Sequence, residues 1–308
     1  MCQRILAADA NISAAGEPHI LLPLLYALKD RGVYSEYDHK ITAQAIKDFC
    51  QHLPDGLDAY FAEIRKTTLS LYEKTGDGSI RYFLDKTPLY HLIVEDIIRL
   101  FPEAKFIFVW RNPLAMVSSI METWRAGGWL LYLYEIDLYR GLSNLVSAYQ
   151  NNTDRTCAIR YEDLVLKPEE TVQSIFSYLE LPYNPEVLTK FQEVRFRSKI
   201  RDPYAHKQDY QTIRQDPLHK WKRIMVNPLR VGWCKRYLRW IGRERLAVMG
   251  YDFDTLMSEV NAQPFSLRFL SRDLYRIPYG KLYTFFEGRI MKQKMRALLA
   301  GENIYIHH

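Results

Sequence analysis

The sequence predicts an α/β fold in which a central, mainly parallel sheet is flanked by helices, and three observations support this. Short apolar runs with the composition of buried strands occur at 81–84, 105–110 and 156–160. A helical pattern follows each run, with a proline near its start at Pro88, Pro113 or Pro168. The 308 residues, 48% of them hydrophobic, are enough for a large core. Because strands that alternate with helices usually pair in parallel, this order of elements indicates the α/β class.

Apolar residues spaced three and four apart predict the helices around these strands. The chain begins inside an amphipathic helical pattern, from Cys2 to Asp9. The next helix follows Gly16, which permits a turn, and begins near Pro18, which suits a first helical turn. Glu17 therefore lies at the start of this helix. The expected helices span 18–29, 40–52, 56–75, 88–100, 113–124, 129–151, 168–179 and 230–247.

Two regions of different character divide the chain. We expect an α/β domain over residues 1–260 and a basic helical extension over 261–308. In the extension, eight basic residues are interleaved with aromatic residues. A solvated helical face, a peripheral contact with a membrane surface and a contact with a polyanion or partner protein all remain open.

Charge, cysteines and hydropathy narrow the class of protein. The net charge of +6 arises from 42 basic and 36 acidic residues, which favours anionic partners only weakly, and we expect no nucleic-acid partner. The four cysteines stand far apart, so neither a zinc site nor a disulfide framework is indicated, and we expect a reducing, cytoplasmic compartment. No internal histidine pair has metal-ligand spacing, and we expect no metal. No apolar run near the start approaches the roughly 20 residues of a bilayer span.

The junction after the strand 105–110 is the most informative candidate site. The strand runs into Arg111-Asn112-Pro113 and then into a helix that carries Ser119. The carboxyl end of a parallel strand lies where ligands collect, and the next helix offers unpaired N–H groups to an anion. A guanidinium and a hydroxyl two helical turns apart could close on one phosphate. The alternative interpretation is an exposed arginine beside a helix cap.

Motifs of several other mechanisms are missing from the sequence. It contains no G-x-x-x-x-G-K-[ST], no G-x-G-x-x-G, no H-E-x-x-H and no G-x-S-x-G. What remains is an ordered set of segments: Gly16-Glu17-Pro18, Asp85-Lys86-Thr87-Pro88, Arg111-Asn-Pro with Ser119, Tyr161-Glu-Asp-Leu with Pro168, and Lys220-Trp221. From residue 1 to about residue 225, this set resembles the sulfotransferases that use 3′-phosphoadenosine 5′-phosphosulfate (PAPS). The resemblance is strongest to the bacterial branch related to protein-tyrosine and glycan sulfotransferases.

The resemblance implies a P-loop-like three-layer fold around a mainly parallel sheet, with PAPS as co-substrate and no metal. Arg111 and Ser119 fall on the positions that bind the 3′-phosphate of PAPS in the family. Tyr161 matches a tyrosine near the same phosphates. Lys220 and Trp221 resemble a late loop that closes over the nucleotide.

The resemblance also implies the catalytic residues. Glu17 matches a general base that removes the proton of the acceptor hydroxyl, and Lys86 matches a lysine that stabilises charge on the bridging or sulfuryl oxygens. The implied partner is a hydroxyl-bearing acceptor: a glycan, a tyrosine or a small molecule. The residues alone leave other roles open, namely Glu17 as the complement of a helix N-terminus, Lys86 as an ion-pair partner of Asp85 and Tyr161 as a packed core residue.

The start of the chain bears on activity. The family opens with a strand and an Arg-Ser-Gly-Thr-Thr turn that holds the 5′-phosphosulfate, followed by a helix similar to Leu-Leu-Gln-Arg-Ile-Leu. This chain starts at Met1-Cys-Gln-Arg-Ile-Leu6, so we expect that first strand and its loop to be missing. Two functions follow: an active sulfotransferase whose recorded start lies downstream of the true one, or a naturally shortened, catalytically poor protein that keeps nucleotide binding or a scaffold role.

Overall fold

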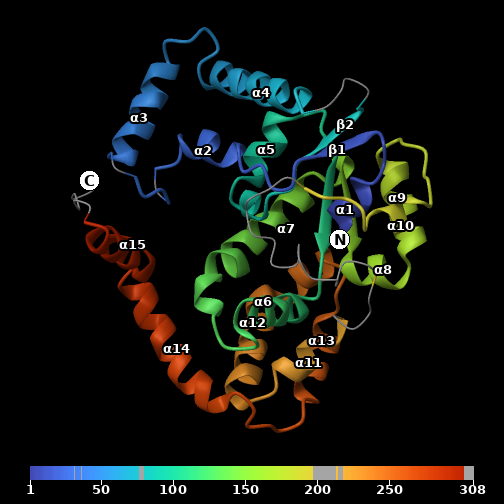
Figure 1. Ribbon diagram of the computed structural model, residues 1–308, viewed down its shortest axis with the longest axis vertical. Helices are drawn as coiled ribbons and strands as arrows, with labels where there is room; N and C mark the ends of the chain where they lie inside the picture. The colour runs from blue at the N-terminus through green and yellow to red at the C-terminus, as the bar shows by residue number, and fades with distance from the viewer. Residues whose placement is uncertain (31, 36, 76–79, 197–212, 214–217, 302–308) are drawn as a thin grey trace. The chain divides into compact units, whose positions relative to one another are not determined.

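The computed structural model describes residues 1–30, 32–35, 37–75, 80–196, 213 and 218–301 (Figure 1). The chain divides into two compact units. Unit 1 comprises Met1–Ala104, Asn184–Asp202 and Arg296–His308, and unit 2 comprises Lys105–Tyr183 and Pro203–Met295. Each unit contains a pair of parallel strands, so the predicted α/β class is confirmed. The division at residue 260 stays a prediction.

Unit 1 is a short parallel strand pair surrounded by helices. β1 (Ile12–Ala14) pairs with β2 (Tyr82–Leu84), with Ala14 opposite Leu84. The helices are α1 (Cys2–Leu6), α2 (Leu21–Tyr26), α3 (His39–Cys50), α4 (Leu57–Glu73), a 3₁₀ helix (Pro88–Leu92), α5 (Val94–Leu100) and α10 (Val187–Lys190). A hydrophobic core within this unit gathers Leu21, Leu25, Ile64, Ile93, Leu100 and Phe101.

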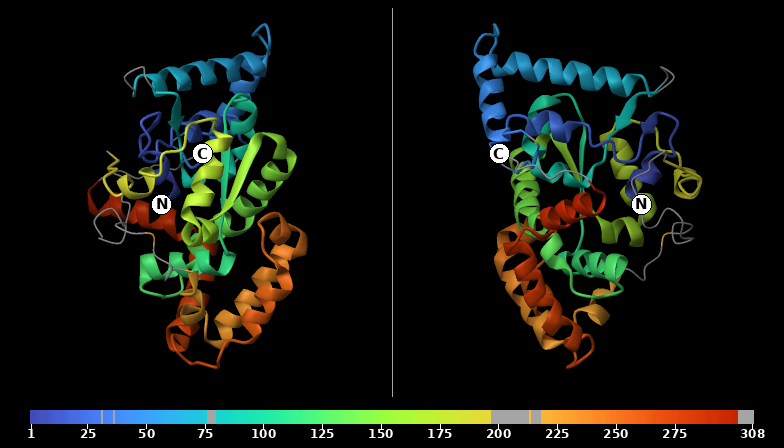
Figure 2. Two further views of the ribbon diagram at one scale, coloured as in Figure 1. Left: turned by 90° about the vertical axis from the view of Figure 1, so that its right-hand side faces the viewer. Right: turned by 60° about the vertical axis from the view of Figure 1, so that its left-hand side comes forward.

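Unit 2 contains the longer strand pair and most of the long helices, and Figure 2 shows these elements from two further sides. β3 (Phe106–Trp110) and β4 (Thr156–Arg160) pair in parallel over five residues, from Phe106 opposite Thr156 to Trp110 opposite Arg160. The α-helices are α6 (Pro113–Arg125), α7 (Leu142–Asn151), α8 (Tyr161–Leu166), α9 (Pro168–Tyr178), α11 (Trp221–Ile224), α12 (Pro228–Val248), α13 (Phe253–Asn261) and α14 (Leu270–Phe285). Short 3₁₀ helices span Leu131–Leu133 and Thr153–Arg155. The helix α15 (Gly288–Leu299) follows α14, and its residues up to Met295 belong to unit 2.

Local sequence explains where the helices after the two strands of unit 2 begin. Asn112 caps α6 through its side chain, and Pro113 occupies its first turn. Pro168 starts α9, whose first turn holds Glu169 and Glu170 beside the positive end of the helix dipole. The strands at 81–84, 105–110 and 156–160 and the starts of these helices are therefore confirmed.

Four expectations about the elements differ from the structure. The helix expected at 88–100 is a 3₁₀ helix at Pro88–Leu92, followed by α5 from Val94. β1 was missed because three residues are too few for a periodic pattern. The helix expected at 18–29 begins only at Leu21, because His19 has a positive φ of 59° that no helical residue adopts.

The long helix expected at 129–151 is interrupted. A 3₁₀ helix at Leu131–Leu133 and a π-helix at Ile136–Gly141 precede α7. The Tyr237 hydroxyl donates a hydrogen bond to the Leu138 carbonyl at 2.9 Å. Insertion of a side chain at a helical carbonyl favours such a widened turn, and no sequence period reveals it.

Candidate functional site

The parallel strands of unit 1 bring Glu17 and Lys86 together. Because Ala14 lies opposite Leu84 at the carboxyl ends of β1 and β2, the residues that follow the two strands emerge side by side. Gly16 makes the turn between β1 and Glu17 with a φ of 82°, a conformation that glycine adopts without steric cost. The predicted catalytic pair therefore stands at the strand ends, where ligands of α/β proteins collect.

Glu17 and Lys86 form a direct ion pair. The Lys86 ammonium donates to Glu17 Oε1, although 69 residues separate the two in sequence. His19 contributes a third group, with Nε2 at 3.6 Å from Glu17 Oε2. The side chains of Glu17 and Lys86 are 26% and 45% exposed, so both remain within reach of a bound ligand. A carboxylate and an ammonium on adjacent loops can accept a proton and stabilise developing negative charge.

Asp85 belongs to a separate buried network behind this pair. Its carboxylate accepts hydrogen bonds from the hydroxyls of Tyr72, Tyr90 and Thr87. Burial raises the pKa of Asp85, although these hydrogen bonds oppose the shift. Lys86 forms its ion pair with Glu17, whereas the Asp85 carboxylate is bound by hydroxyl groups. This network fixes the loop that carries Lys86.

His19 is a residue at the site that the sequence analysis missed. Its backbone amide donates to Thr87 Oγ1 at 3.2 Å, which ties the loop after β1 to the loop after β2. The only sequence signal was its place directly after Gly16-Glu17-Pro18. A positive φ outside glycine is rarely visible from sequence, so the contact with Glu17 required the structure.

Arg111 and Tyr161 meet at the end of the strand pair of unit 2. Trp110 lies opposite Arg160, and Arg111 and Tyr161 are the next residues along each strand. The Arg111 guanidinium carbon lies 4.4 Å from the centroid of the Tyr161 ring. Burial raises the pKa of Tyr161, and the positive charge of Arg111 partly opposes this rise. Stacking on an aromatic ring orients the guanidinium.

The backbone amides at the N-terminus of α6 are hydrogen-bonded within the protein, whereas the sequence predicted unpaired amides. Asn112 Oδ1 accepts from the amides of Leu114 and Ala115, at 2.9 and 3.3 Å. The backbone N–H of Asn112 donates to Glu162 Oε1 at 3.1 Å, and Pro113 has no N–H. The prediction of unpaired amides for an anion was therefore wrong for these positions, because the helix is capped by its own residues. The groups at this junction that could meet an anion are therefore side chains.

Two adjacent serines on α6 have different environments. Ser118 is buried and its hydroxyl donates to the Ala115 carbonyl at 3.0 Å, whereas Ser119 is half-buried. This favours Ser119 as the serine that meets a ligand.

Replacing Ser119 by Ala is expected to weaken the binding of adenosine 3′,5′-bisphosphate about tenfold, because a hydrogen bond to a charged group is lost. Calorimetric titration measures the dissociation constant. Ser118→Ala is the matched control, with unchanged affinity expected because its hydroxyl bonds within the helix. Equal effects of both substitutions would exclude a specific role for Ser119.

The residues Lys220 and Trp221 lie at a short helix. Lys220 is the N-cap of α11, and its ammonium lies 3.5 Å from Glu122 Oε2. Trp221 begins the helix and is 1% exposed. The resemblance implied a loop that closes over the nucleotide, and the described part of this region is instead a helical turn with its indole in the core. Nucleotide contact by this pair stays a prediction.

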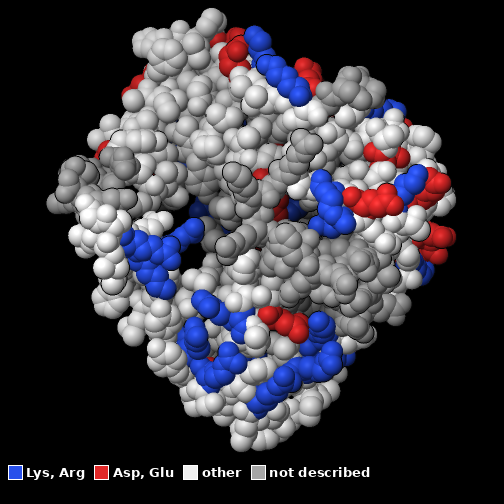
Figure 3. Space-filling model, viewed as in Figure 1, with Lys and Arg blue, Asp and Glu red and all other residues white. Residues whose placement is uncertain are grey.

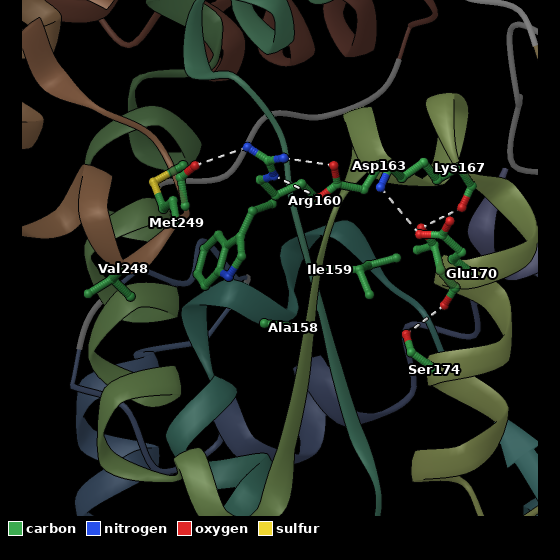
Figure 4. Close-up of a pocket in the computed structure, with 12 residues that line it drawn as sticks. Ala158, Ile159, Arg160, Asp163, Lys167, Glu170, Ser174, Val248 and Met249 are labelled. Atoms are coloured by element: carbon green, nitrogen blue, oxygen red, sulfur yellow. Dashed lines mark hydrogen bonds and ion pairs between the residues drawn. The ribbon is translucent and has the colours of Figure 1, made fainter. Parts of the chain in front are cut away.

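A pocket of about 580 Å³ opens beside β4 (Figure 4). Its lining includes Trp110, Arg160, Lys167 and Glu170. Two hydrogen bonds of 2.7 Å join Arg160 to the Asp163 carboxylate, and a third joins it to the Gly250 carbonyl. The hydrogen bonds between the two side chains raise the pKa of the Arg160 guanidinium and lower the pKa of the Asp163 carboxyl. The guanidinium is thus engaged by protein groups, and the sequence analysis did not single it out.

The described residues hold neither a candidate metal site nor a candidate membrane span. In that part of the chain, no cluster of three or more His, Cys, Asp or Glu side chains is arranged to hold a metal ion. No helix over the same residues combines the length and the hydropathy needed to cross a membrane.

Comparisons with known proteins give a consistent family. A model of the sulfotransferase family matches residues 1–185 of this chain. Nodulation protein NoeE of Sinorhizobium fredii is 30% identical over 127 residues, which are 34% of this chain and 29% of that protein. A protein-tyrosine sulfotransferase of Drosophila melanogaster is 31% identical over 130 residues, 41% of this chain and 26% of that protein. The matches thus span less than a third of the length of these two relatives.

A solved structure is also similar. The sulfotransferase domain from the curacin biosynthetic pathway has a TM-score of 0.49 and 22% sequence identity, and the alignment covers 73% of this chain and 86% of that domain.

Proposed function

Since this chain belongs to the sulfotransferase family, we propose that it transfers a sulfuryl group from PAPS to an acceptor hydroxyl. The observation that carries the proposal is the ion pair of Glu17 and Lys86 at the adjacent ends of β1 and β2. A base and a cation side by side are the two groups that sulfuryl transfer needs from a protein, because the reaction depends on positioning and charge stabilisation. The enzyme class proposed is a PAPS-dependent transferase.

In the proposed reaction, the acceptor oxygen attacks the sulfur atom of PAPS. A new oxygen–sulfur bond forms as the bond between sulfur and the bridging phosphate oxygen breaks, and adenosine 3′,5′-bisphosphate leaves. The Glu17 carboxylate takes the proton of the acceptor hydroxyl. The Lys86 ammonium stabilises the negative charge that develops on the bridging or sulfuryl oxygens.

Arg111, Ser119 and Tyr161 are proposed to hold the 3′-phosphate of the nucleotide. The stacking of Arg111 on Tyr161 supports this role, because it pre-orients a fork of N–H donors at the end of β3. The capped amides of α6 make these side chains the main source of binding energy there.

The acceptor class is proposed from chemistry and from the names of the relatives. A tyrosine, a glycan hydroxyl and a small alcohol each present an oxygen that Glu17 could deprotonate. Protein-tyrosine sulfotransferases among the relatives make tyrosine the first acceptor to test. The four free cysteines support a reducing compartment, and we propose the cytoplasm.

The deciding experiment incubates the protein with sulfur-labelled PAPS and separate extracts of peptides, glycans and lipids. Transfer of label to one of them, together with binding of adenosine 3′,5′-bisphosphate, is the expected result. Nucleotide binding without transfer would instead favour the shortened, catalytically poor protein of the same fold. Absence of both would contradict each of these functions.

Arg111→Ala is expected to raise the dissociation constant of adenosine 3′,5′-bisphosphate about 10- to 150-fold, which corresponds to roughly 1.5–3 kcal/mol for one charge-assisted contact. Calorimetry measures the change. Arg239→Ala, on the exposed side of α12, is the matched control and should bind like the unaltered protein. An unchanged constant in Arg111→Ala would reject the phosphate-binding assignment.

A further inference from the structure

The helix α14 is packed on one face and apolar on the other. On its inner face, Asp273 is fully buried against Arg230, and Gly280 lies close to the Tyr132 ring. On its outer face, Leu282 and Phe285 are 57% and 79% exposed. A helix that is apolar on two faces is usually covered on both, so this outer face has the character of a contact surface.

The helix α15 continues this surface with an amphipathic pattern. Met291, Met295 and Leu298 recur at spacings of four and three and therefore share one face. They are 50%, 56% and 62% exposed. At 3.6 residues per turn, Lys292 and Lys294 lie on opposite sides of this stripe. An apolar stripe edged by lysines is the arrangement of a helix that lies in a membrane interface.

Side-chain contacts connect α14 and α15 at their junction. The rings of Phe285 and Phe286 meet edge to face at 5.0 Å. The Lys292 ammonium lies 5.2 Å from the centroid of the Tyr283 ring on α14. Figure 3 shows basic side chains over α15 and the region below it in that view. Between residues 274 and 301 the sequence has six Lys or Arg residues and one acid, Glu287.

We propose that the surface formed by α14 and α15, called the basic apolar surface, binds peripherally to a lipid bilayer with anionic headgroups. Acyl chains can cover Phe285, Met291 and Met295, while the headgroup phosphates and carboxylates meet the lysines. A second copy of this chain fits less well, because a two-fold contact would bring the same cations against one another without acids to pair them. A polyanion would satisfy the cations and leave the apolar side chains in water.

Vesicle sedimentation with the full chain tests the proposal. We expect binding to vesicles of phosphatidylcholine mixed with phosphatidylserine, and at least tenfold weaker binding to phosphatidylcholine alone. Lys292→Gln with Lys294→Gln should weaken binding to the mixed vesicles by about tenfold or more and reduce its salt dependence. Phe285→Ser with Met295→Ser should weaken it by a similar factor, because apolar area no longer enters the interface.

Matched controls carry the same changes elsewhere. Ile41→Ser alters a 68% exposed isoleucine on α3, and Lys66→Gln alters an exposed lysine on α4, so both should bind vesicles like the unaltered protein. Circular dichroism checks that each variant is folded.

Equal losses in the controls, or no binding to the mixed vesicles, would overturn the proposal. So would a dimer in sedimentation velocity that the Ser substitutions dissociate, or heparin binding that competes with vesicles while the Ser substitutions have no effect. Sulfuryl transfer measured without vesicles should be the same in all variants, which separates this proposal from the proposed function.

Discussion

Glu17→Gln is expected to lower the turnover of sulfuryl transfer by about 10²–10⁴-fold, the usual contribution of a general base. The amide has nearly the shape of the carboxylate, but it cannot accept the acceptor's proton. It can still accept a hydrogen bond from Lys86, which donates to Glu17 Oε1 in the present structure. Steady-state kinetics with labelled PAPS give kcat, and calorimetry with adenosine 3′,5′-bisphosphate should give an unchanged dissociation constant.

The control for this prediction is Glu73→Gln, at the exposed C-terminal end of α4. It removes one carboxylate from the same unit, so its turnover should match that of the unaltered protein. Lys86→Met should also lower kcat strongly, because the charge that stabilises the departing oxygen is gone. Turnover that survives in both Glu17→Gln and Lys86→Met would reject their assigned roles.

Asp273→Asn is expected to lower the free energy of unfolding of the protein by about 3–5 kcal/mol, because it leaves a buried guanidinium without its countercharge. Arg230 and Asp273 are both 0% exposed and are joined by two hydrogen bonds of 2.6 and 2.8 Å. Asn227 donates a further bond to Asp273 Oδ2 at 2.7 Å. Urea titration followed by far-ultraviolet circular dichroism measures the change.

An exposed pair of the same chemistry provides the comparison. Arg243 and Asp254 also form a two-pronged ion pair, but their side chains are 64% and 66% exposed. Because water and salt screen exposed charges, Asp254→Asn should leave the urea midpoint close to that of the unaltered protein. Similar midpoints for the Asp273→Asn and Asp254→Asn proteins would show that burial does not make the Arg230 pair important.

The strands and many of the helix starts could be predicted because their signals are local. The run from Phe106 to Trp110 is apolar and short, and a proline at a first helical turn marks the helices at Pro113 and Pro168. The family, too, followed from segments that each lie within a few residues, and the family match over residues 1–185 confirms it. The prediction of one continuous helix at 129–151 was wrong where a side chain distant in sequence, that of Tyr237, bonds to the Leu138 carbonyl.

The sequence predicted most residues of the candidate site, but it predicted their contacts with one another only in part. Both ends of the Glu17–Lys86 pair were identified, but their contact depends on the pairing of β1, a strand too short to recognise. The backbone amides at the start of α6 were expected to be unpaired, yet the Asn112 side chain caps them. His19 carried no signal beyond its position in sequence.

By itself, the sequence determined the α/β class, three of the four strands, the family and a set of candidate site residues, because periodicity and short motifs are properties of neighbouring residues. Only the tertiary structure decided which of those residues meet. It paired Glu17 with Lys86 and Arg111 with Tyr161. It also buried Trp221 in a helical turn and left the outer faces of α14 and α15 exposed. Strand register and burial arise from contacts between distant segments, and no local pattern encodes them.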